Sequence, residues 1–250
     1  VGTTPGSQSW APLRRDSPTQ KRNLKNAESV IQYISENDDY EDDQHRISDI
    51  AMIILSGLES TSHSLSWIIY EIVNNDSELQ KMRKALNSHD VALAHEMLKD
   101  IVREGMRLHP INNMIGSRIA GKDFFLDDTS LVIPEGSTVV FPTALFTRFN
   151  MKDADKFQPS RWQTTKDDDA PQHYLLFSLG SHSCAGQSIA LAEIAWVLSR
   201  VCSQYNFQIT RDDTQKGATM KCVGVHMKVQ NIGQEAGSRF TSNPQGGSFE

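Results

Sequence analysis

A cysteine lies between two glycines in residues 177–186, just ahead of an expected helix. Gly180 permits a tight turn, because glycine adopts positive φ at little cost. Cys184 falls at the expected start of the helix, where unpaired backbone amides and the helix dipole favour a thiolate. Gly186 lets another group approach the backbone closely. A thiolate held among amide donors is suited to ligating a haem iron.

Two other interpretations of this cysteine stay open on the residues alone. The first is a buried structural cysteine in a loop before a helix. The second is a zinc site, which is weaker because the spacing to the other Cys and His residues suits no common tetrahedral set. The three cysteines, at positions 184, 202 and 222, form no disulfide framework and no paired CxxC knuckle. Such an odd, sparse set suits a reducing compartment.

The spacing Phe-x-x-Gly-x-x-x-Cys-x-Gly resembles the signature of the cytochrome P-450 family. Every fixed position is filled, by Phe177, Gly180, Cys184 and Gly186. The resemblance implies that Cys184 is the axial iron ligand of haem b (iron protoporphyrin IX) and that the other three residues belong to the cofactor-binding loop. The family has a His or Arg two residues before the cysteine, which contacts a haem propionate. Here that residue is His182.

Glu104 and Arg107 stand three residues apart on one expected helix, so their side chains meet. Taken alone, the spacing favours an ordinary surface ion pair worth about 0.3–0.5 kcal/mol. The family, however, has Glu-x-x-Arg at this place and an Arg in a later Pro-x-Arg-aromatic stretch, which is Arg161 here. The resemblance implies a structural triad behind the haem pocket, because two guanidiniums can satisfy a buried Glu.

Arg118 precedes the first expected strand, where the family commonly has an Arg that reaches the other propionate. The alternative is an ordinary surface Arg. The resemblance therefore implies a cofactor-binding role for Arg118.

The segment Ser-Gly-Leu-Glu-Ser-Thr at 56–61 resembles the part of the family's central helix that crosses the distal face of the haem. The resemblance implies that Gly57 leaves room for O₂, and that Glu59 and Ser60, with Thr61 beside them, relay protons to oxygen. Ser60 stands where Thr is commoner, and it lacks the methyl group that fixes the rotamer. The alternative is that Ser60 and Thr61 only bond back to helix carbonyls.

The elements that must position these residues follow from the apolar pattern. A helix is predicted from Ser48 or Asp49 to Asn74. Its apolar residues cover most of the circumference, which is typical of a central helix: Ile50, Ile53, Ile54, Leu55, Leu65, Ile68, Ile69 and Ile72. Further helices are predicted at about 77–85, 91–108 and 186–205. The inward-facing residues of the last helix are predicted to be Ile189, Leu191, Ile194, Val197, Leu198 and Val201.

Short alternating pieces with turn residues at 115–142 predict a small β-sheet, and 207–209 with 222–229 predict a closing hairpin. The fold class is therefore mainly α with a small β portion, an incomplete cytochrome P-450 haem domain. Residues 1–45 are predicted to be a largely disordered lead-in, 46–230 the C-terminal part of the haem domain, and 231–250 a disordered tail.

The resemblance covers roughly the last half of a typical member, and the first residue is Val1 rather than Met. The unmatched half of the family carries most substrate contacts. We therefore expect either a fragment of a working enzyme or a truncated, non-catalytic remnant.

The function implied by the resemblance is monooxygenation of a small organic substrate, with electrons from a reductase partner. A haem-thiolate isomerase or dehydratase is an alternative, against which the acid–alcohol pair argues. The net charge of -6 argues against a nucleic-acid partner. The sequence contains no run of about 18 apolar residues, so no membrane span is predicted in it. The resemblance implies the endoplasmic reticulum membrane as the location of a full-length eukaryotic member of the family.

Overall fold

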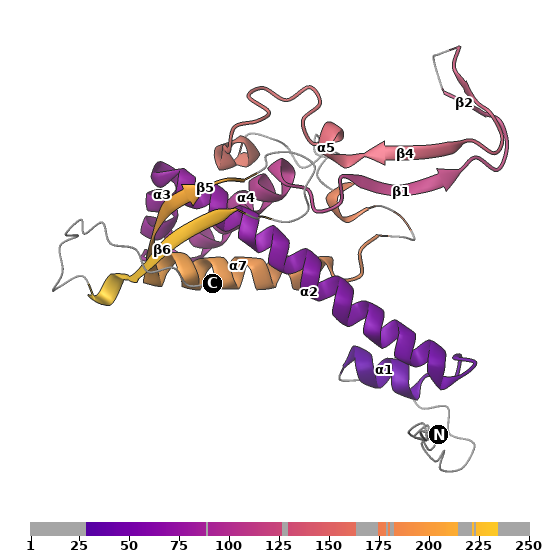
Figure 1. Cartoon of the computed structure of the whole chain (residues 1–250), viewed down its shortest axis with the longest axis horizontal. Helices are drawn as coiled ribbons and strands as arrows, with labels where there is room; N and C mark the ends of the chain where they lie inside the picture. Colours follow the sequence, from indigo (N-terminus) through magenta and orange to yellow (C-terminus); the bar gives the residue numbers. More distant parts are fainter. Residues whose placement is uncertain are drawn as a thin grey trace, which may run out of the picture. The chain divides into compact units, whose positions relative to one another are not determined.

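The computed structural model describes residues 29–88, 90–126, 130–163, 175–178, 180, 183–214, 222 and 224–234. The chain divides into two compact units, Val1–Ile54 and Leu55–Glu250. Figure 1 gives the names of the helices and strands. Most of the predicted lead-in and tail lies outside the described residues, so the predicted division of the chain at 45 and 230 stays a prediction.

The first unit holds α1 (Val30–Glu36) and the beginning of α2 (Asp43–Asn74). The prediction that α2 begins at Ser48 or Asp49 is wrong by at least five residues. The physical reason is an earlier cap: the Asp42 carboxylate accepts the backbone N–H of His45 at 2.9 Å. Hydrogen bonds from His45 also lower the pKa of Asp42. The acidic stretch before the helix is therefore a helix start and not only a linker.

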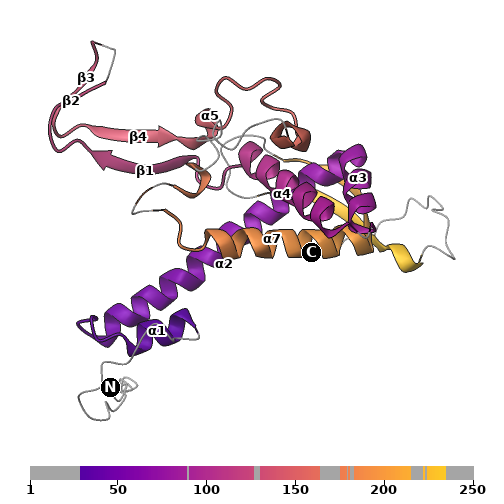
Figure 2. The ribbon, with the colours of Figure 1, turned by 180° about the vertical axis from the view of Figure 1, so that it is seen from behind.

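The second unit contains the rest of α2 and three further long helices, α3 (Asp76–Leu86), α4 (Val91–Leu108) and α7 (Gln187–Gln204). All three were predicted to within two residues at either end. Asp90 begins α4 by accepting the backbone N–H of Leu93 at 3.0 Å. Helices α3 and α4 both pack against α7, as Figures 1 and 2 show from opposite sides.

In the part of the chain that the structure describes, the strands form three separate antiparallel pairs. β1 (Met114–Ile119) pairs with β4 (Thr138–Pro142), β2 (Phe124–Phe125) with β3 (Val132–Ile133), and β5 (Tyr205–Asp212) with β6 (Val225–Asn231). The shorter elements are α5 (Thr143–Phe146) and 3₁₀ turns at Pro159–Gln163, Leu175–Phe177 and Ile232–Gln234. The predicted fold class, mainly α with a small β portion, is confirmed.

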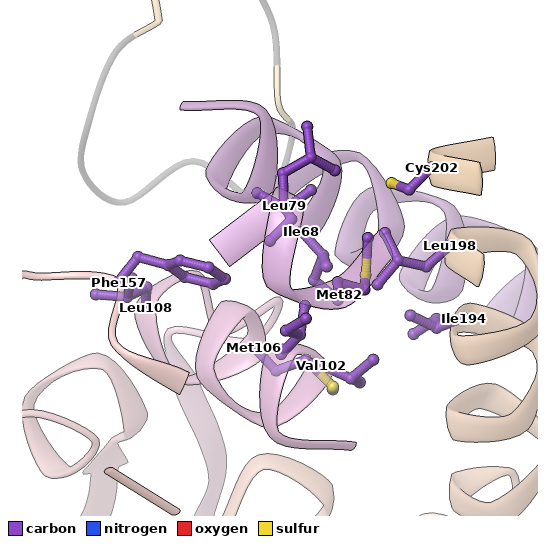
Figure 3. Packing of buried hydrophobic residues seen from close by; sticks show 12 residues of the cluster. Ile68, Leu79, Met82, Val102, Met106, Leu108, Phe157, Ile194, Leu198 and Cys202 are labelled. Carbon is purple, nitrogen blue, oxygen red and sulfur yellow. The ribbon is translucent and has the colours of Figure 1, made fainter. Parts of the chain in front are cut away.

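One apolar core joins α2, α3, α4 and α7 within the second unit (Figure 3). Its buried residues are Ile68, Ile72, Leu79, Met82, Ile101, Val102, Met106, Leu108, Phe157, Ile194, Leu198 and Cys202. The α2 members are spaced at i and i+4, and the α7 members at i, i+4 and i+8, so each set lies on one face of its helix. The core therefore fixes the positions of α2 and α7 relative to each other.

Part of the predicted core is exposed. On α2, Ile53, Ile54 and Leu55 are exposed by 47%, 56% and 65%, and Ile189 on α7 is exposed by 68%. A helix that is apolar all round needs partners on every side. The described elements bury α2 only from Ser64 onward. The prediction of a central helix therefore holds for the second half of α2 and fails for the first half.

We expect Gly105→Ala to destabilise the fold, because α4 approaches α2 closely at this glycine. A Cβ added at Gly105 would lie 2.5 Å from Cγ1 of the fully buried Ile68. Overpacking of this kind costs about 1–3 kcal/mol, which exceeds the gain of about 1 kcal/mol from helix propensity. Urea denaturation of the variant should show a lower midpoint.

Gly57→Ala is the matched control, because a Cβ at Gly57 on α2 would meet nothing within 4 Å. We expect this variant to be at least as stable as the parent. Equal stability of the two alanine variants would contradict the close approach of the helices.

Candidate functional site

Main-chain hydrogen bonds within the loop before α7 hold its described residues together. The Cys184 N–H donates to the Phe177 carbonyl at 2.8 Å, and the Ser183 N–H donates to the Gly180 carbonyl at 3.1 Å. Gly180 has φ +72°, the conformation that glycine adopts most easily. Ser178 also has a positive φ, of 60°. Positive φ angles and two main-chain hydrogen bonds therefore shape the described part of the loop that leads to the cysteine ahead of α7.

Cys184 lies three residues before the first residue of α7, Gln187, so it precedes the helix and is not part of it. Gly186 takes the N-cap position, and its carbonyl accepts the Ala190 N–H at 2.9 Å. The sequence prediction placed the cysteine at the helix start. The structure differs because the tight turn at 185–186 comes between them.

The three cysteines differ in accessibility. Cys184 is exposed, whereas burial raises the pKa of Cys202 to about 12. Burial, with the nearby carboxylates of Asp212 and Glu71, raises the pKa of Cys222 to about 11. A thiolate is therefore disfavoured at Cys202 and Cys222. Of the three cysteines, Cys184 is the one that is exposed, and its role as an iron ligand stays a prediction.

Small residues keep the surroundings of Cys184 open. A Cβ added at Gly186 would have the Cys184 Sγ, 3.9 Å away, as its nearest neighbour, and one added at Gly180 would meet nothing within 4 Å. Among the described residues, these two glycines therefore leave space near the cysteine. Within the described ranges, no three His, Cys, Asp or Glu side chains gather as a protein-only metal site requires. His182 lies outside the described residues, so its contact with a propionate stays a prediction.

The predicted oxygen-side residues lie on the open half of α2. Glu59 and Ser60 are exposed and Thr61 is partly exposed. A Cβ added at Gly57 would meet no described residue within 4 Å. The Ser60 hydroxyl donates to the Ser56 carbonyl at 2.6 Å. This is the back-bonding that the alternative interpretation described. Rotation of χ1 would release the hydroxyl, so the bond defines a resting arrangement.

The shared core connects these two segments. On α2, Ser60 lies one turn before the buried Ser64 and two turns before Ile68. On the other side, Cys184 leads into α7, whose Ile194 and Leu198 pack in the same core as Ile68. Both segments are therefore joined in the chain to helices that share one core, α2 after Ser60 and α7 after Cys184.

Glu104, Arg107 and Arg161 meet in the interior. Arg107 donates from Nε to Glu104 Oε2 and from Nη2 to Oε1, both at 2.9 Å, and both side chains are fully buried. Arg161 Nε donates to Oε1 at 2.9 Å, as does the backbone N–H of Gln158. The carboxylate therefore accepts four hydrogen bonds, three of them from guanidiniums, which is the condition for burying a charge.

The remaining donors of both arginines bind main-chain carbonyls. Arg107 Nη1 donates to Ala154 O at 2.6 Å and to Thr147 O at 3.4 Å, and Nη2 donates to Lys156 O at 3.2 Å. Arg161 Nη1 donates to Lys152 O at 3.0 Å. The cluster therefore holds the irregular segment 147–163 against α4. Its location behind a haem stays a prediction.

Arg118 lies within β1, not before it, opposite Val139 of β4. Its side chain is exposed, and Nη1 donates to the Ser117 carbonyl at 3.1 Å. Arg118 lies inside the strand because residues 114–119 pair with β4, with an irregularity in the register between Ile115 and Ser117. The propionate contact of Arg118 stays a prediction.

A polar cluster behind the core was not predicted. The His109 ring stacks on Trp67 with 3.9 Å between centroids, and its Nε2 lies 2.7 Å from the Glu71 carboxylate. Tyr70 donates to Asp212 on β5 at 2.9 Å. These contacts tie the ends of α2 and α4 to the β5–β6 pair. The i, i+4 spacing of Trp67 and Glu71 was the available signal, but their partner comes from another helix end.

We expect Glu104→Gln to destabilise the fold strongly. The amide removes the charge that offsets two guanidiniums, and breaking a buried pair costs about 3–5 kcal/mol. Thermal or urea unfolding would measure the loss. Glu96→Gln is the control, because Glu96 makes an exposed pair with Lys99 on the same helix, and little change is expected there. Equal stability of the two variants would contradict a structural role for Glu104.

The sequence of the chain is similar to those of one known family. The family description "Cytochrome P450" matches residues 13–232. The chain is 29% identical over 192 residues to cytochrome P450 3A12 of Canis lupus familiaris, covering 70% of this chain and 38% of that protein. It is 31% identical over 175 residues to cytochrome P450 3A19 of Capra hircus aegagrus, covering 64% of this chain and 78% of that protein.

A third relative is cytochrome P450 3A28 of Bos taurus, 28% identical over 215 residues. The chain spans about two fifths of the length of the dog and cattle proteins, at 38% and 41%. The family match covers most of the chain, in the region that contains the cysteine loop, the glutamate–arginine cluster and the hydroxyl-bearing helix. The chain therefore belongs to the cytochrome P450 family of haem-thiolate monooxygenases.

Proposed function

We propose that the full-length protein is a haem-dependent monooxygenase in which Cys184 is the axial ligand of haem b. The observation that carries this proposal is the exposed Cys184 thiol on a self-folded loop before α7, in a chain whose other two cysteines have raised pKa values. The residues around it suit a flat ring with a central metal, because Gly180 and Gly186 leave its approach open.

Each residue has a proposed part in holding the cofactor. Cys184 supplies the thiolate, and Phe177, partly buried against the core, anchors the start of the loop. His182 and Arg118 would neutralise the two propionates by charge-assisted hydrogen bonds. When bound, the haem supplies activation of O₂, so that one oxygen atom enters the substrate and the other leaves as water.

The residues on α2 are proposed to manage protons. Gly57 leaves space beside the helix, and Glu59 is exposed to solvent, from which it can take a proton. The Ser60 hydroxyl can pass that proton on after it leaves the Ser56 carbonyl. Thr61, the next hydroxyl along the helix, is proposed to assist. An acid and an alcohol on one helix supply the two proton-carrying groups at the ends of such a path.

The proposed partners are an electron-donating reductase and a small organic substrate. The endoplasmic reticulum membrane is the location that we propose for the full-length protein. In the part of the chain that the structure describes, no helix has the length and apolar character needed to cross a bilayer.

We expect Cys184→Ala in the full-length protein to abolish the red-shifted Soret band of the reduced carbon monoxide complex, because that band requires thiolate ligation. Absorption spectra of the parent and variant test this directly. Cys222→Ala is the control and should keep the band. A band that survives Cys184→Ala would remove this residue as the ligand, and turnover without a reductase or O₂ would favour an isomerase or dehydratase.

We expect Ser60→Ala to raise peroxide release relative to substrate oxidation, roughly tenfold or more, because a proton-donating hydroxyl is lost. Peroxide and product would be measured against electrons consumed. Ser62→Ala is the matched control: this hydroxyl donates to the Glu59 carbonyl on the same helix at 3.1 Å. If the two variants couple equally well, Ser60 has no role in proton transfer.

A further inference from the structure

His63 lies one helical turn beyond Glu59 and Ser60 on α2. Residues three and four apart on a helix are neighbours on its surface. Side chains on a helix also lean toward its N-terminus, so a residue covers the turn that precedes it. The position of His63 on α2 thus allows its imidazole to reach the turn that carries the Glu59 carboxylate and the Ser60 hydroxyl.

Hydrogen-bonding capacity is unfilled on this face. The Nδ1 atom of His63 is buried and has no hydrogen-bond partner within the described part of the chain. Such a buried nitrogen is unfavourable until it gains a partner. The Ser60 hydroxyl donates its hydrogen bond to the Ser56 carbonyl at 2.6 Å. The oxygen of the same hydroxyl can still accept a hydrogen bond from another donor. His63 and Ser60 are thus a donor and an acceptor on one face.

We infer that His63 is a positioning residue that acts through Ser60, by donating a proton to Ser60 Oγ while the Ser60 hydroxyl passes its own proton on. The imidazole regains a proton from Glu59, which regains one from solvent. One proton enters at Glu59 and one leaves at Ser60, so every group returns to its starting state. The inference rests on the proposed function.

A serine at position 60 explains why a second donor, His63, would be useful beside it. Serine lacks the methyl group that holds a threonine rotamer, so its hydroxyl settles easily on a helix carbonyl. A donor on Oγ polarises the hydroxyl and makes its proton easier to transfer, since hydrogen bonds in a chain strengthen one another. His63 therefore favours the arrangement in which Ser60 can donate outward.

The test uses the full-length haem-loaded protein with His63→Leu and His63→Asn, each alone and combined with Ser60→Ala. His95→Leu is the control, because His95 is exposed on α4. The spectrum of the reduced carbon monoxide complex is recorded first, because the red-shifted Soret band verifies folding and thiolate ligation. If His63→Leu loses this band, the conclusions are drawn from His63→Asn, whose side chain is polar and close in size to histidine. Peroxide release and the association rate of hydrogen cyanide with the ferric protein follow. The hydrogen cyanide measurement needs no turnover. It depends on proton transfer because hydrogen cyanide must lose its proton in the pocket when it binds.

Both His63 variants should release on the order of tenfold more peroxide per electron and bind hydrogen cyanide several-fold more slowly. Neither should add to the effect of Ser60→Ala, because two residues in one path are not additive. Parent-like values in the His63 variants, or effects that add fully to Ser60→Ala, would overturn the inference alone. A parent protein without the thiolate band would overturn the proposed function and this inference with it.

Discussion

The buried carboxylate of Glu104 constrains much of the second unit. An ionised group without exposure is tolerated only where every lone pair has a donor. Two arginines and one backbone N–H meet that requirement, and they come from two places: Arg107 on α4, and the segment around Gln158 and Arg161. The segment after β4 must therefore return to α4 whatever its own conformational preference.

A second constraint is the contact between α2 and α4 at Gly105, which brings one helix backbone against Ile68 of the other. The same Ile68 belongs to the core that includes Ile194 and Leu198 of α7. Helices that share a close-packed core cannot move independently. The segment with Ser60 and the loop with Cys184 thus inherit a fixed geometry from residues that carry no chemistry of their own.

The sequence predicted the parts of the structure that depend on local pattern. The limits of α3, α4 and α7 follow from periodicity and caps, and the cysteine loop follows from the spacing of Gly180, Cys184 and Gly186. The prediction of where α2 begins failed because Asp42 caps it within an acidic run that also suits a linker. The stack of Trp67 on His109 depends on the meeting of two helix ends, which no local pattern encodes. For Ile189, periodicity gave the wrong side of the helix.

The carbonyl acceptors of Arg107 have a consequence for sequence variation. The Arg107 guanidinium donates to the main-chain carbonyls of Thr147, Ala154 and Lys156. Every residue type has such a carbonyl, whatever its side chain. A substitution at any of these three residues leaves its carbonyl acceptor chemically unchanged, whereas an insertion or deletion between Thr147 and Lys156 would change the spacing of the three carbonyls. Arg107 therefore constrains the length of this stretch more directly than it constrains the identity of its side chains.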